Sequence, residues 1–424
     1  MMRSKLVSRS IFLFALSTIC VWVGEKMTSG PARGDDLTFD QTTRNLNVCT
    51  RAFQNRKDSE NLKKCCQQLY RGDEQAILAS SKIHIPPNDD ILNDQLESCD
   101  DFFDGHPSYM TRMRHAPDDE NSHFSIAFSI LAHRDLHHVE GLLSLIYRPQ
   151  HFYCIHADKK SVGLEKKLGK LARCLPNVKM ASRSHTVVWG GNGILRATLT
   201  CLKDLLSHNK WSYFINLSAQ DMPLKTNSEL VRILSSWNNR SSVEIVGPAP
   251  QKKVRYYHQV KYNRFGNADS VFRTDKKKTQ NPPYNATLMK GNLAAVLSRP
   301  LAQWFATSPK ASKLLAYLSD TANPDEYFWQ TVLANRQQFG LDGTLGDLID
   351  PYYVRYSLWK GENQKKCKGK FIRDVCVFGA GDIGRLSKIG KYLFVNKLYL
   401  GYQTPAYECM AMRHRMRSEL DDKL

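Results

Sequence analysis

The stretch Phe124-Ser-Ile-Ala-Phe-Ser-Ile-Leu-Ala132 decides the fold class, because a short, almost continuous apolar run of this kind forms a buried strand. It is followed by a helical apolar period over Asp135–Tyr147 and by a second strand-like run, Phe152–His156. The alternation then continues, with helices expected at Leu164–Cys174, Ile194–Leu206 and Asn227–Trp237 and extended runs at Val178–Met180 and Tyr213–Leu217. Strands that alternate with helices predict an α/β domain with a largely parallel central sheet.

The pattern loosens after the extended run Val243–Val246. Residues 250–285 are basic and rich in turn-forming residues, so we expect a solvated loop there. A strand at Ala294–Leu297 and a helix over Leu301–Leu318 are expected to follow. Upstream of the first strand, residues 61–123 have a mixed composition and are expected to be helical in part.

Length and composition bound the class of protein. The chain has 424 residues, enough for one large domain or two smaller ones, and its 42% of hydrophobic residues can build a sizeable core. The formal net charge is +19. A basic balance of this size points to nucleic acid, an acidic membrane surface or phosphate-bearing ligands.

The N-terminus indicates the compartment. Arg3, Lys5 and Arg9 precede the apolar run Ile11–Val23, which is the pattern of a signal peptide or a signal-anchor. No convincing small-x-small cleavage site follows the run, so we favour an uncleaved anchor over a cleaved signal. Basic residues before the run place the N-terminus in the cytoplasm and the rest of the chain across the membrane. Entry into the secretory pathway argues against nucleic acid as a partner.

These observations divide the chain into five parts. We expect a cytoplasmic tail over residues 1–10, a signal-anchor over 11–24, a polar stem over 25–60, an N-terminal lumenal region over 61–123 and the main α/β domain over 124–424.

Cysteine usage agrees with an oxidising space. Of 11 cysteines, Cys20 lies in the anchor and the others are spread along the chain, which favours disulfides over a zinc site. Asn239 and Asn285 begin sequons for N-glycosylation. Asn216 begins a third, but it lies inside a strand-like run and is expected to be buried and unused.

The segment Gly379-Ala-Gly381-Asp-Ile-Gly384 fits G-x-G-x-x-G, which on its own suggests a dinucleotide site. Too little chain follows for a nucleotide-binding fold of several βα units, so this interpretation is weak. The motif is either a glycine turn after a strand or part of a loop that Cys367 and Cys376 pin and whose cations hold a diphosphate. Those cations are Lys365, Lys366, Lys368, Lys370, Arg373, Arg385, Lys388, Lys391 and Lys397.

Two adjacent acids stand out in Thr321-Ala-Asn-Pro-Asp-Glu-Tyr-Phe-Trp-Gln-Thr331. Pro324 suits the first turn of a helix, Asn323 is a good N-cap, and acids in a first turn are favoured by the helix dipole. That interpretation is purely structural. The alternative is that the three aromatic residues after Glu326 wall off one carboxylate and make it a general base.

No two aspartates stand two residues apart, so the sequence lacks the Asp-x-Asp that holds Mn²⁺ and diphosphate in metal-dependent sugar-nucleotide enzymes. A diphosphate would then need Lys and Arg as counter-charge. Asp158 ends the second strand, where doubly wound sheets bind ligands, and it could accept from a ribose or base. It could equally cap the helix that follows.

These residues together resemble one family, the branching β-1,6-N-acetylglucosaminyltransferases of core 2 and I-antigen type, with the peptide O-xylosyltransferases as more distant relatives. The resemblance extends from about Cys66 to Cys409. It is carried by the blocks Phe152-Tyr-Cys-Ile-His-Ala-Asp158, Trp211-Ser-Tyr-Phe-Ile-Asn-Leu217, Asp221-Met-Pro-Leu-Lys-Thr-Asn227, Pro324-Asp-Glu-Tyr-Phe-Trp329 and Val375-Cys-Val-Phe-Gly-Ala-Gly-Asp382, and Trp189-Gly-Gly191 is closer to the I-branching and xylosyl members.

The resemblance implies a GT-A-type fold, Rossmann-like, in the domain over 124–424 and an inverting transfer from a UDP-sugar without any metal or other cofactor. It implies that Glu326 is the catalytic base and that Arg373 and Lys397 bind the diphosphate. It also implies that Asp158 and His133 contact the nucleotide. It also implies the disulfides Cys66–Cys409, Cys99–Cys174, Cys154–Cys201 and Cys367–Cys376, which leaves Cys49 and Cys65 to pair together or between chains in a disulfide-linked homodimer.

The acceptor side departs from the family pattern. Where the family has Trp-x-Tyr, this chain has Tyr356-Ser-Leu358, so one aromatic hydroxyl is lost. The acceptor residues expected from the resemblance are Glu244, Lys253, Arg255, Asp325 and Tyr356. The departures leave the donor sugar open between N-acetylglucosamine, glucose and xylose.

The resemblance therefore implies a single-pass type II Golgi membrane glycosyltransferase, with its catalytic domain in the lumen, that extends an O-glycan or glycoprotein acceptor. The alternatives are a non-catalytic lumenal glycan-binding relative and, on the glycine motif alone, a nucleotide-cofactor oxidoreductase.

Overall fold

The computed structural model describes residues 47–54, 58–114, 124–361 and 364–421. The expected cytoplasmic tail, the anchor and most of the stem lie outside these residues. Among the helices described, none combines the length and apolar character needed to span a membrane.

A six-stranded sheet forms the centre, in the order β3-β2-β1-β4-β11-β6. Its parallel part comprises β1 (Ser125–Ala132), β2 (Phe152–Ala157), β3 (Val178–Met180) and β4 (Trp211–Ser218). Ile130 of β1 lies opposite Ile155 of β2 and Leu217 of β4, so the strands end at one edge. The antiparallel strands β11 (Ala295–Ser298) and β6 (Ser242–Val243) complete the sheet. The expectation of a largely parallel α/β sheet is confirmed.

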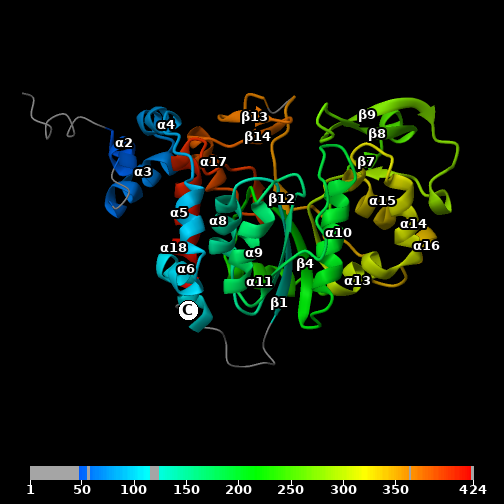
Figure 1. The fold of residues 1–424 in the computed structure, drawn as a ribbon, viewed down its shortest axis with the longest axis horizontal. Helices are drawn as coiled ribbons and strands as arrows, with labels where there is room; N and C mark the ends of the chain where they lie inside the picture. The colour runs from blue at the N-terminus through cyan, green and yellow to red at the C-terminus, as the bar shows by residue number, and fades with distance from the viewer. Residues whose placement is uncertain (1–46, 55–57, 115–123, 362–363, 422–424) are drawn as a thin grey trace, which may run out of the picture. The chain divides into compact units, whose positions relative to one another are not determined.

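Helices cover both faces of this sheet (Figure 1). On one side lie α8 (Leu136–Ile146), α9 (Leu164–Cys174) and α11 (Asn227–Ser235), and on the other α10 (Gly193–Leu205) and α13 (Arg299–Thr307). Because side chains alternate along a strand, β1 contributes Ile126, Phe128 and Ile130 to one apolar cluster and Ala127 to the other. Burial on both faces explains why the strands have continuous apolar sequences.

The helix expected over Leu301–Leu318 is two helices, α13 and α14 (Pro309–Leu318). Pro309 causes the break, because the residue before a proline is disfavoured in helical conformation and Ser308 is extended at ψ 127°. The chain continues into the 3₁₀ turn η2 (Pro324–Glu326), α15 (Phe328–Ala334) and α16 (Arg336–Phe339).

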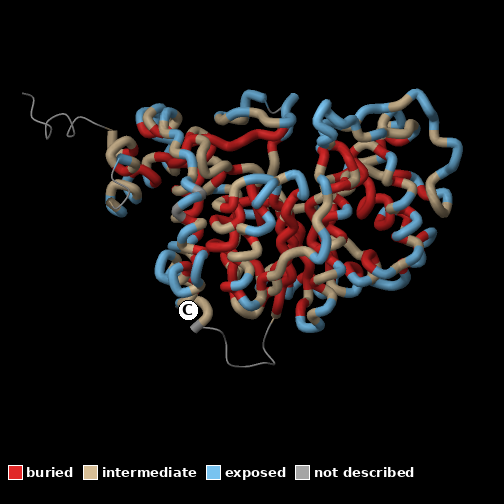
Figure 2. The backbone as a smooth tube through the Cα atoms, in the orientation of Figure 1, coloured by how far each residue is buried: buried red, intermediate tan, exposed pale blue. Residues whose placement is uncertain are grey.

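The expectation of a solvated loop over residues 250–285 is wrong in one respect, because most of the segment forms regular secondary structure. After α12 (Gln251–Val254), β8 (Tyr256–Tyr262) and β9 (Ala268–Lys277) form an antiparallel hairpin, which is exposed over most of its length (Figure 2). The Oδ1 of Asn263 accepts hydrogen bonds from the amides of Phe265 and Asn267 and so fixes the turn. The turn η1 (Pro283–Asn285) follows the hairpin. The short strand β7 (Gly247–Pro248), before the hairpin, pairs with β10 (Met289–Lys290), after it.

The N-terminal helices begin earlier than the boundary expected at residue 61, since α2 (Val48–Gln54) already contains the buried Cys49. The others are α3 (Ser59–Arg71), α4 (Glu74–Ser81), α5 (Asp89–Gln95), α6 (Cys99–Gly105) and α7 (Pro107–Arg114). The C-terminal helix α18 (Thr404–Asp421) packs against α3 and α4.

Five disulfides join these parts. Four have the pairings that the resemblance implied, Cys66–Cys409, Cys99–Cys174, Cys154–Cys201 and Cys367–Cys376. The fifth joins Cys49 to Cys65 within the chain, so of the two options for these cysteines the structure shows the internal bond and not a bond to a second chain. Every cysteine in the described part of the chain is therefore paired.

Two small sheets close the fold beside the parallel strands. One has the order β12-β15-β5 and contains Arg355–Tyr356, Phe394–Asn396 and Asp221–Pro223. The other is the hairpin of β13 (Lys370–Ile372) and β14 (Val375–Val377), which leads into the turn η3 (Ala380–Asp382) and α17 (Ile383–Leu386).

The three sequons differ in exposure. Asn216 is buried, its amide nitrogen donates to the carbonyl of Leu293, and its Oδ1 accepts from Ala295, so this side chain is structural. Asn239 and Asn285 are exposed, and their glycosylation stays a prediction.

Candidate active site

A pocket of about 520 Å³ opens at the carboxyl ends of the parallel strands. The strand ends contribute His133 after β1, Asp158 after β2 and Ser218 at the end of β4. Remote segments complete it with Glu326, Arg373 and Lys397. Ligands of open α/β sheets bind at this edge, so the pocket is the candidate active site.

The acid pair lies in η2, which begins differently from the expected helix start. Asn323 is in the left-handed conformation at φ 55°, and its side chain caps nothing; its carbonyl accepts from the amide of Glu326 at 2.9 Å. Asn323 is instead anchored by its own amide, which donates to Gly190 at 2.7 Å. The α-helix proper starts only at Phe328, because the acids belong to a separate 3₁₀ turn.

Glu326 faces the pocket beside a lysine. Its carboxylate oxygen Oε2 is 3.6 Å from the Nζ of Lys290, and the two side chains are 20% and 39% exposed. The same oxygen is buried and has no hydrogen-bond partner in the described part of the chain. Sequence reasoning missed Lys290, because it is distant in the chain and no motif surrounds it.

The position of Glu326 is fixed through its backbone. Its carbonyl accepts from the amide of Gly291 at 2.9 Å. A Cβ atom at Gly291 would lie 1.8 Å from the carbonyl oxygen of Glu244, so only glycine fits this close approach.

Asp325, and not Glu326, is the acid enclosed by protein. Burial, followed by the charge of Glu326, raises the pKa of Asp325 to about 7. Its Oδ1 is buried without a hydrogen-bond partner among the described residues. The aromatic residues that follow are core: Tyr327, Phe328 and Trp329 are all buried.

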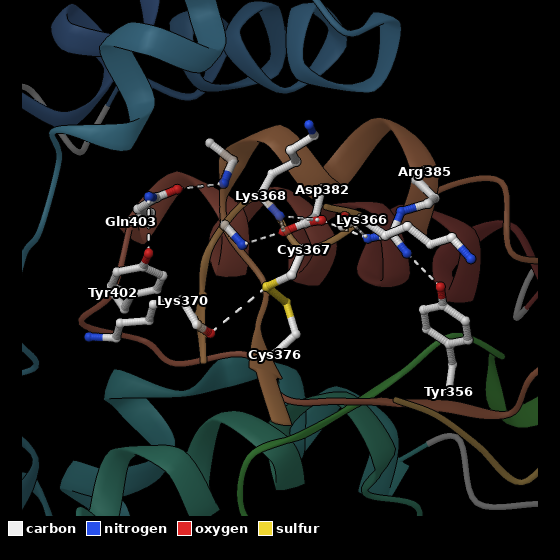
Figure 3. The surroundings of a disulfide bond; sticks show 12 residues. Tyr356, Lys366, Cys367, Lys368, Lys370, Cys376, Asp382, Arg385, Tyr402 and Gln403 are labelled. Carbon is white, nitrogen blue, oxygen red and sulfur yellow. Dashed lines mark hydrogen bonds and ion pairs between the residues drawn. A yellow bond between two sulfur atoms is a disulfide. The ribbon is translucent and has the colours of Figure 1, made fainter. Parts of the chain in front are cut away.

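Arg373 is presented by the tip of the β13–β14 hairpin. Arg373 and Asp374 form a two-residue loop with φ of 51° and 60°, the conformation of a type I′ turn. The Cys367–Cys376 disulfide holds the strands of this hairpin, and Figure 3 shows its surroundings.

Lys397 lies next to Arg373 in the pocket. Burial, and then the positive charge of Arg373, lowers the pKa of Lys397 to about 8. Its Nζ donates to the carbonyl of Ile372 at 3.4 Å, so it contacts the same hairpin. Two adjacent cations of this kind form a site for a polyanionic ligand.

The strand ends add a histidine and an aspartate. Burial, and then the charges of Arg134 and Arg373, lowers the pKa of His133 to about 4, so its imidazole is neutral at pH 7. Asp158 is buried, and its Oδ1 accepts from the amides of Lys160 and Val187, both at 3.1 Å. It therefore closes a local turn and ties the 187–189 segment to β2, and the first helical residues of α9 lie further on, after Gly163.

A buried network beneath the pocket was also missed from sequence. Asp221 accepts from Arg355 at 2.7 Å and from Asn396 at 3.0 Å, which joins β5, β12 and β15. Arg355 and Asn396 line the pocket as well. The network fixes the chain directly before Lys397, and only the three-dimensional pairing of distant strands reveals it.

The expected acceptor residues are not gathered in this pocket, apart from Asp325. Tyr356 accepts a hydrogen bond from Arg385 at 2.5 Å and stacks on Phe378, while its neighbours Arg355 and Ser357 line the pocket. Arg255 is exposed and Lys253 lines a separate groove. Glu244 is near Lys290, whose charge partly offsets the rise in the pKa of Glu244 that burial causes.

The glycine motif forms a turn around Asp382. The carboxylate of Asp382 accepts from the amides of Lys368 and Gly379 and from Arg385 at 2.6 Å (Figure 3). A Cβ atom at Gly384 would lie 3.2 Å from the carbonyl of Leu69 in α3. These contacts give the glycines a packing role, as in the structural interpretation of the motif.

In the described part of the chain, one group of three potential metal ligands is close enough to share an ion, Cys367, Cys376 and Asp382. Both cysteines are in a disulfide, so the group does not suit a metal. It also lies outside the pocket.

A parallel α/β sheet with an acid and two adjacent cations in one pocket at its carboxyl edge defines an α/β enzyme. Comparison with known proteins makes this specific. The family described as Core-2/I-Branching enzyme matches residues 126–387, more than half of the chain. The chain belongs to the Core-2/I-Branching enzyme family.

The names of proteins with similar sequences agree with this family assignment. The chain is 31% identical over 371 residues to the human beta-1,3-galactosyl-O-glycosyl-glycoprotein beta-1,6-N-acetylglucosaminyltransferase 3, covering 81% of each chain. It is 31% identical over 366 residues to the human N-acetyllactosaminide beta-1,6-N-acetylglucosaminyl-transferase, covering 84% of this chain and 86% of that one. To the mouse beta-1,3-galactosyl-O-glycosyl-glycoprotein beta-1,6-N-acetylglucosaminyltransferase 4 it is 33% identical over 301 residues, covering 69% and 66%.

Proposed function

We propose that this protein is an inverting glycosyltransferase that transfers a sugar from a UDP-sugar in β linkage to an O-glycan core, with Glu326 as general base. The observation that carries the proposal is the pocket itself, which holds a carboxylate with an unpartnered oxygen together with a pair of adjacent cations. The names of the relatives make N-acetylglucosamine the first donor sugar to test and a β-1,6 linkage the first product.

The base acts on the acceptor. A sugar hydroxyl is a poor nucleophile until its proton is removed, and Glu326 accepts that proton as the oxygen bonds to the anomeric carbon of the donor. The bond from that carbon to the diphosphate breaks on the opposite face, so the configuration inverts in one displacement. Lys290 forms an ion pair with Glu326, its Nζ lying 3.6 Å from Oε2.

The cations act on the leaving group. UDP departs with increasing negative charge on its diphosphate, and Arg373 and Lys397 stabilise that charge without having to reorganise. His133 and Asp158, at the ends of β1 and β2, are our candidates for contacts to the nucleotide. With these roles, the nucleotide binds over the strand ends and the acceptor binds on the side of Glu326.

Catalysis without a divalent metal belongs to the same proposal. Of the acids that line the pocket, Asp158 is occupied by two backbone amides and Asp325 is enclosed by protein. We expect EDTA to leave the transfer rate unchanged, as measured by UDP release. Loss of activity that Mn²⁺ restores would contradict metal-free catalysis.

The test of the base is Glu326→Gln, which keeps the size of the side chain and removes its ability to take a proton. Turnover should fall by roughly 10²–10⁴-fold, while UDP affinity stays near that of the wild type. Arg373→Ala is the complementary variant and should weaken UDP binding. Glu165→Gln, an exposed change in α9, is the matched control.

The two variants also separate the rival functions. Near wild-type turnover of Glu326→Gln would remove it as the base. UDP affinity that is unchanged by Arg373→Ala would assign the cations to structure. A non-catalytic glycan-binding relative would bind glycans and show no transfer in the wild-type protein.

We further propose that the protein acts in the Golgi lumen as a type II membrane protein anchored by residues 11–24, which lie outside the described part of the chain. Its five disulfides require an oxidising compartment.

A further inference from the structure

A second groove, of about 320 Å³, lies beside the active-site pocket. Its walls come from the loop at Trp189 and Gly190, from the β8–β9 hairpin and from the chain just before the catalytic turn. Trp189 lines both the groove and the pocket, and its side chain is 54% exposed. A ligand that extends out of the pocket past Trp189 therefore enters the groove.

The groove carries one sign of charge. Its titratable lining residues are Lys252, Lys253, His258 and Arg273, and its described lining contains no acid. His258 and Arg273 are opposite each other in the hairpin, so both side chains project from one face. The guanidinium of Arg273 is 4.7 Å from the ring of Tyr256, which holds it in place.

Lys252, Lys253 and Arg273 have no ion-pair partner in the described part of the chain, although carboxylates pair with basic residues elsewhere in the protein. From Gln251 to Lys278 the sequence has nine Lys and Arg residues against two Asp. Burial lowers the pKa of His258, a hydrogen bond to the backbone of Tyr256 partly offsets this, and the charges of Lys278, Arg273 and Lys253 lower it further. An uncompensated cluster of this kind attracts an anion.

The groove is rigidly joined to the turn that holds Glu326. The amide of His258 donates to the carbonyl of Asp320 at 2.8 Å, and the Nζ of Lys278 donates to Thr321 at 2.8 Å. Asn323, whose amide donates to Gly190, is part of the groove and precedes the acid pair. The cations therefore stand at a fixed distance from the base.

We propose that this groove is an accessory acceptor subsite for an anionic group, a sulfate or a carboxylate, carried by the acceptor glycan. The proposal rests on the proposed function, because it takes the side of the pocket near Glu326 as the acceptor side. It adds that the enzyme prefers acidic acceptors over the corresponding neutral ones.

The experiment uses the full-length protein and four probes. These are the neutral disaccharide galactosyl-β-1,3-N-acetylgalactosamine, its sulfated form, its sialylated form and an acidic hexapeptide. The test variant is the double change Lys252→Gln and Arg273→Gln. The matched control is Lys276→Gln with Lys277→Gln, which removes the same charge from exposed positions of the same segment outside the groove.

Calorimetry without donor should show that the wild type binds at least one anionic glycan more tightly than the neutral one. In the groove variant, the ratio of the affinities for the anionic and neutral glycans should fall about tenfold, the size expected for charged hydrogen bonds. The control variant should keep the wild-type ratio. The ratio of kcat/KM values for the anionic and neutral glycans should fall in parallel. The sulfated and sialylated arms distinguish the two sources of the anion.

Several results would overturn the proposal. These are equal affinity of the wild type for the neutral and both anionic glycans, an equal loss in the groove and control variants, or tighter binding of the acidic peptide than of either anionic glycan. Measuring the binding of these probes by Glu326→Gln separates the hypothesis of the anionic subsite from the hypothesis that Glu326 is the base. If that variant retains transfer but the groove variant loses the preference, the subsite stands and the assignment of the base fails.

Discussion

At the scale of single residues, the acid pair shows how neighbours in sequence take different roles. The side chain of Glu326 is 20% exposed and has a lysine 3.6 Å from its Oε2, whereas Asp325 is buried. Sequence reasoning correctly placed both acids in one turn but attached the aromatic enclosure to the catalytic acid. It is Asp325 that burial affects, because the side chains of a 3₁₀ turn point in different directions.

Asp325 makes stability depend on pH. The pKa of Asp325 is raised from 3.8 to about 7 in the folded protein, so folding favours its protonated form. This contribution to stability is complete below about pH 4 and is lost as pH rises towards 7. Asp325→Asn imitates the protonated form at every pH.

Relative to the wild type, Asp325→Asn should therefore gain free energy of unfolding as pH rises from 4 to 8, by roughly 2–4 kcal/mol. The measurement is urea unfolding at both pH values, with Asp269→Asn on the exposed hairpin as control. A difference between Asp325→Asn and wild type that is constant with pH would refute a buried, titrating Asp325.

At the scale of elements, the turn that holds Glu326 depends on the short strand β10. Gly291 follows β10 and donates to the carbonyl of Glu326. Gly291→Ala would place a methyl group 1.8 Å from the carbonyl oxygen of Glu244. The expected result is a loss of roughly 1–3 kcal/mol of stability and a fall in kcat as Glu326 shifts.

Gly169→Ala is the matched control for this substitution. Gly169 lies in α9 with no atom within 4 Å of its added Cβ, so alanine should raise stability by up to about 1 kcal/mol through helix propensity. Thermal unfolding and steady-state rates measure both variants. If Gly291→Ala behaves like Gly169→Ala, the backbone does not position Glu326.

The elements also show where sequence reasoning succeeds. The strands from Phe124 to Leu217 were predictable because burial on both faces makes them continuously apolar. The hairpin of β8 and β9 was not, since both of its faces are largely exposed and its charges conceal the strand pattern. In the site, Lys290 and the Asp221–Arg355 pair depend on contacts between distant segments, which local spacing does not encode.

At the scale of the whole molecule, disulfides of very different span make different contributions. Cys66–Cys409 closes a separation of 343 residues and Cys367–Cys376 one of 9. In the chain-entropy account, a longer loop restricts the unfolded state more. Replacing Cys66 and Cys409 by serine should cost roughly 5–6 kcal/mol, against roughly 2–3 kcal/mol for Cys367 and Cys376.

Guanidinium unfolding of the two double variants compares these costs directly, and UDP binding supplies a second readout. Loss of Cys367–Cys376 should weaken UDP binding more than loss of Cys66–Cys409, because Arg373 lies between the two linked cysteines. Equal stability costs for the two variants would contradict the loop-entropy account.

The Cys66–Cys409 bond also sets an order on biosynthesis. Cys66 leaves the ribosome early, but its partner is in the last helix, and the hydroxyl of Tyr70 likewise donates to the carbonyl of Cys409. The N-terminal helices therefore cannot be joined to α18 by this bond until α18 has been synthesised. A nascent chain that stops short of this helix carries an unpaired thiol at Cys66 and lacks the helix against which α3 and α4 pack.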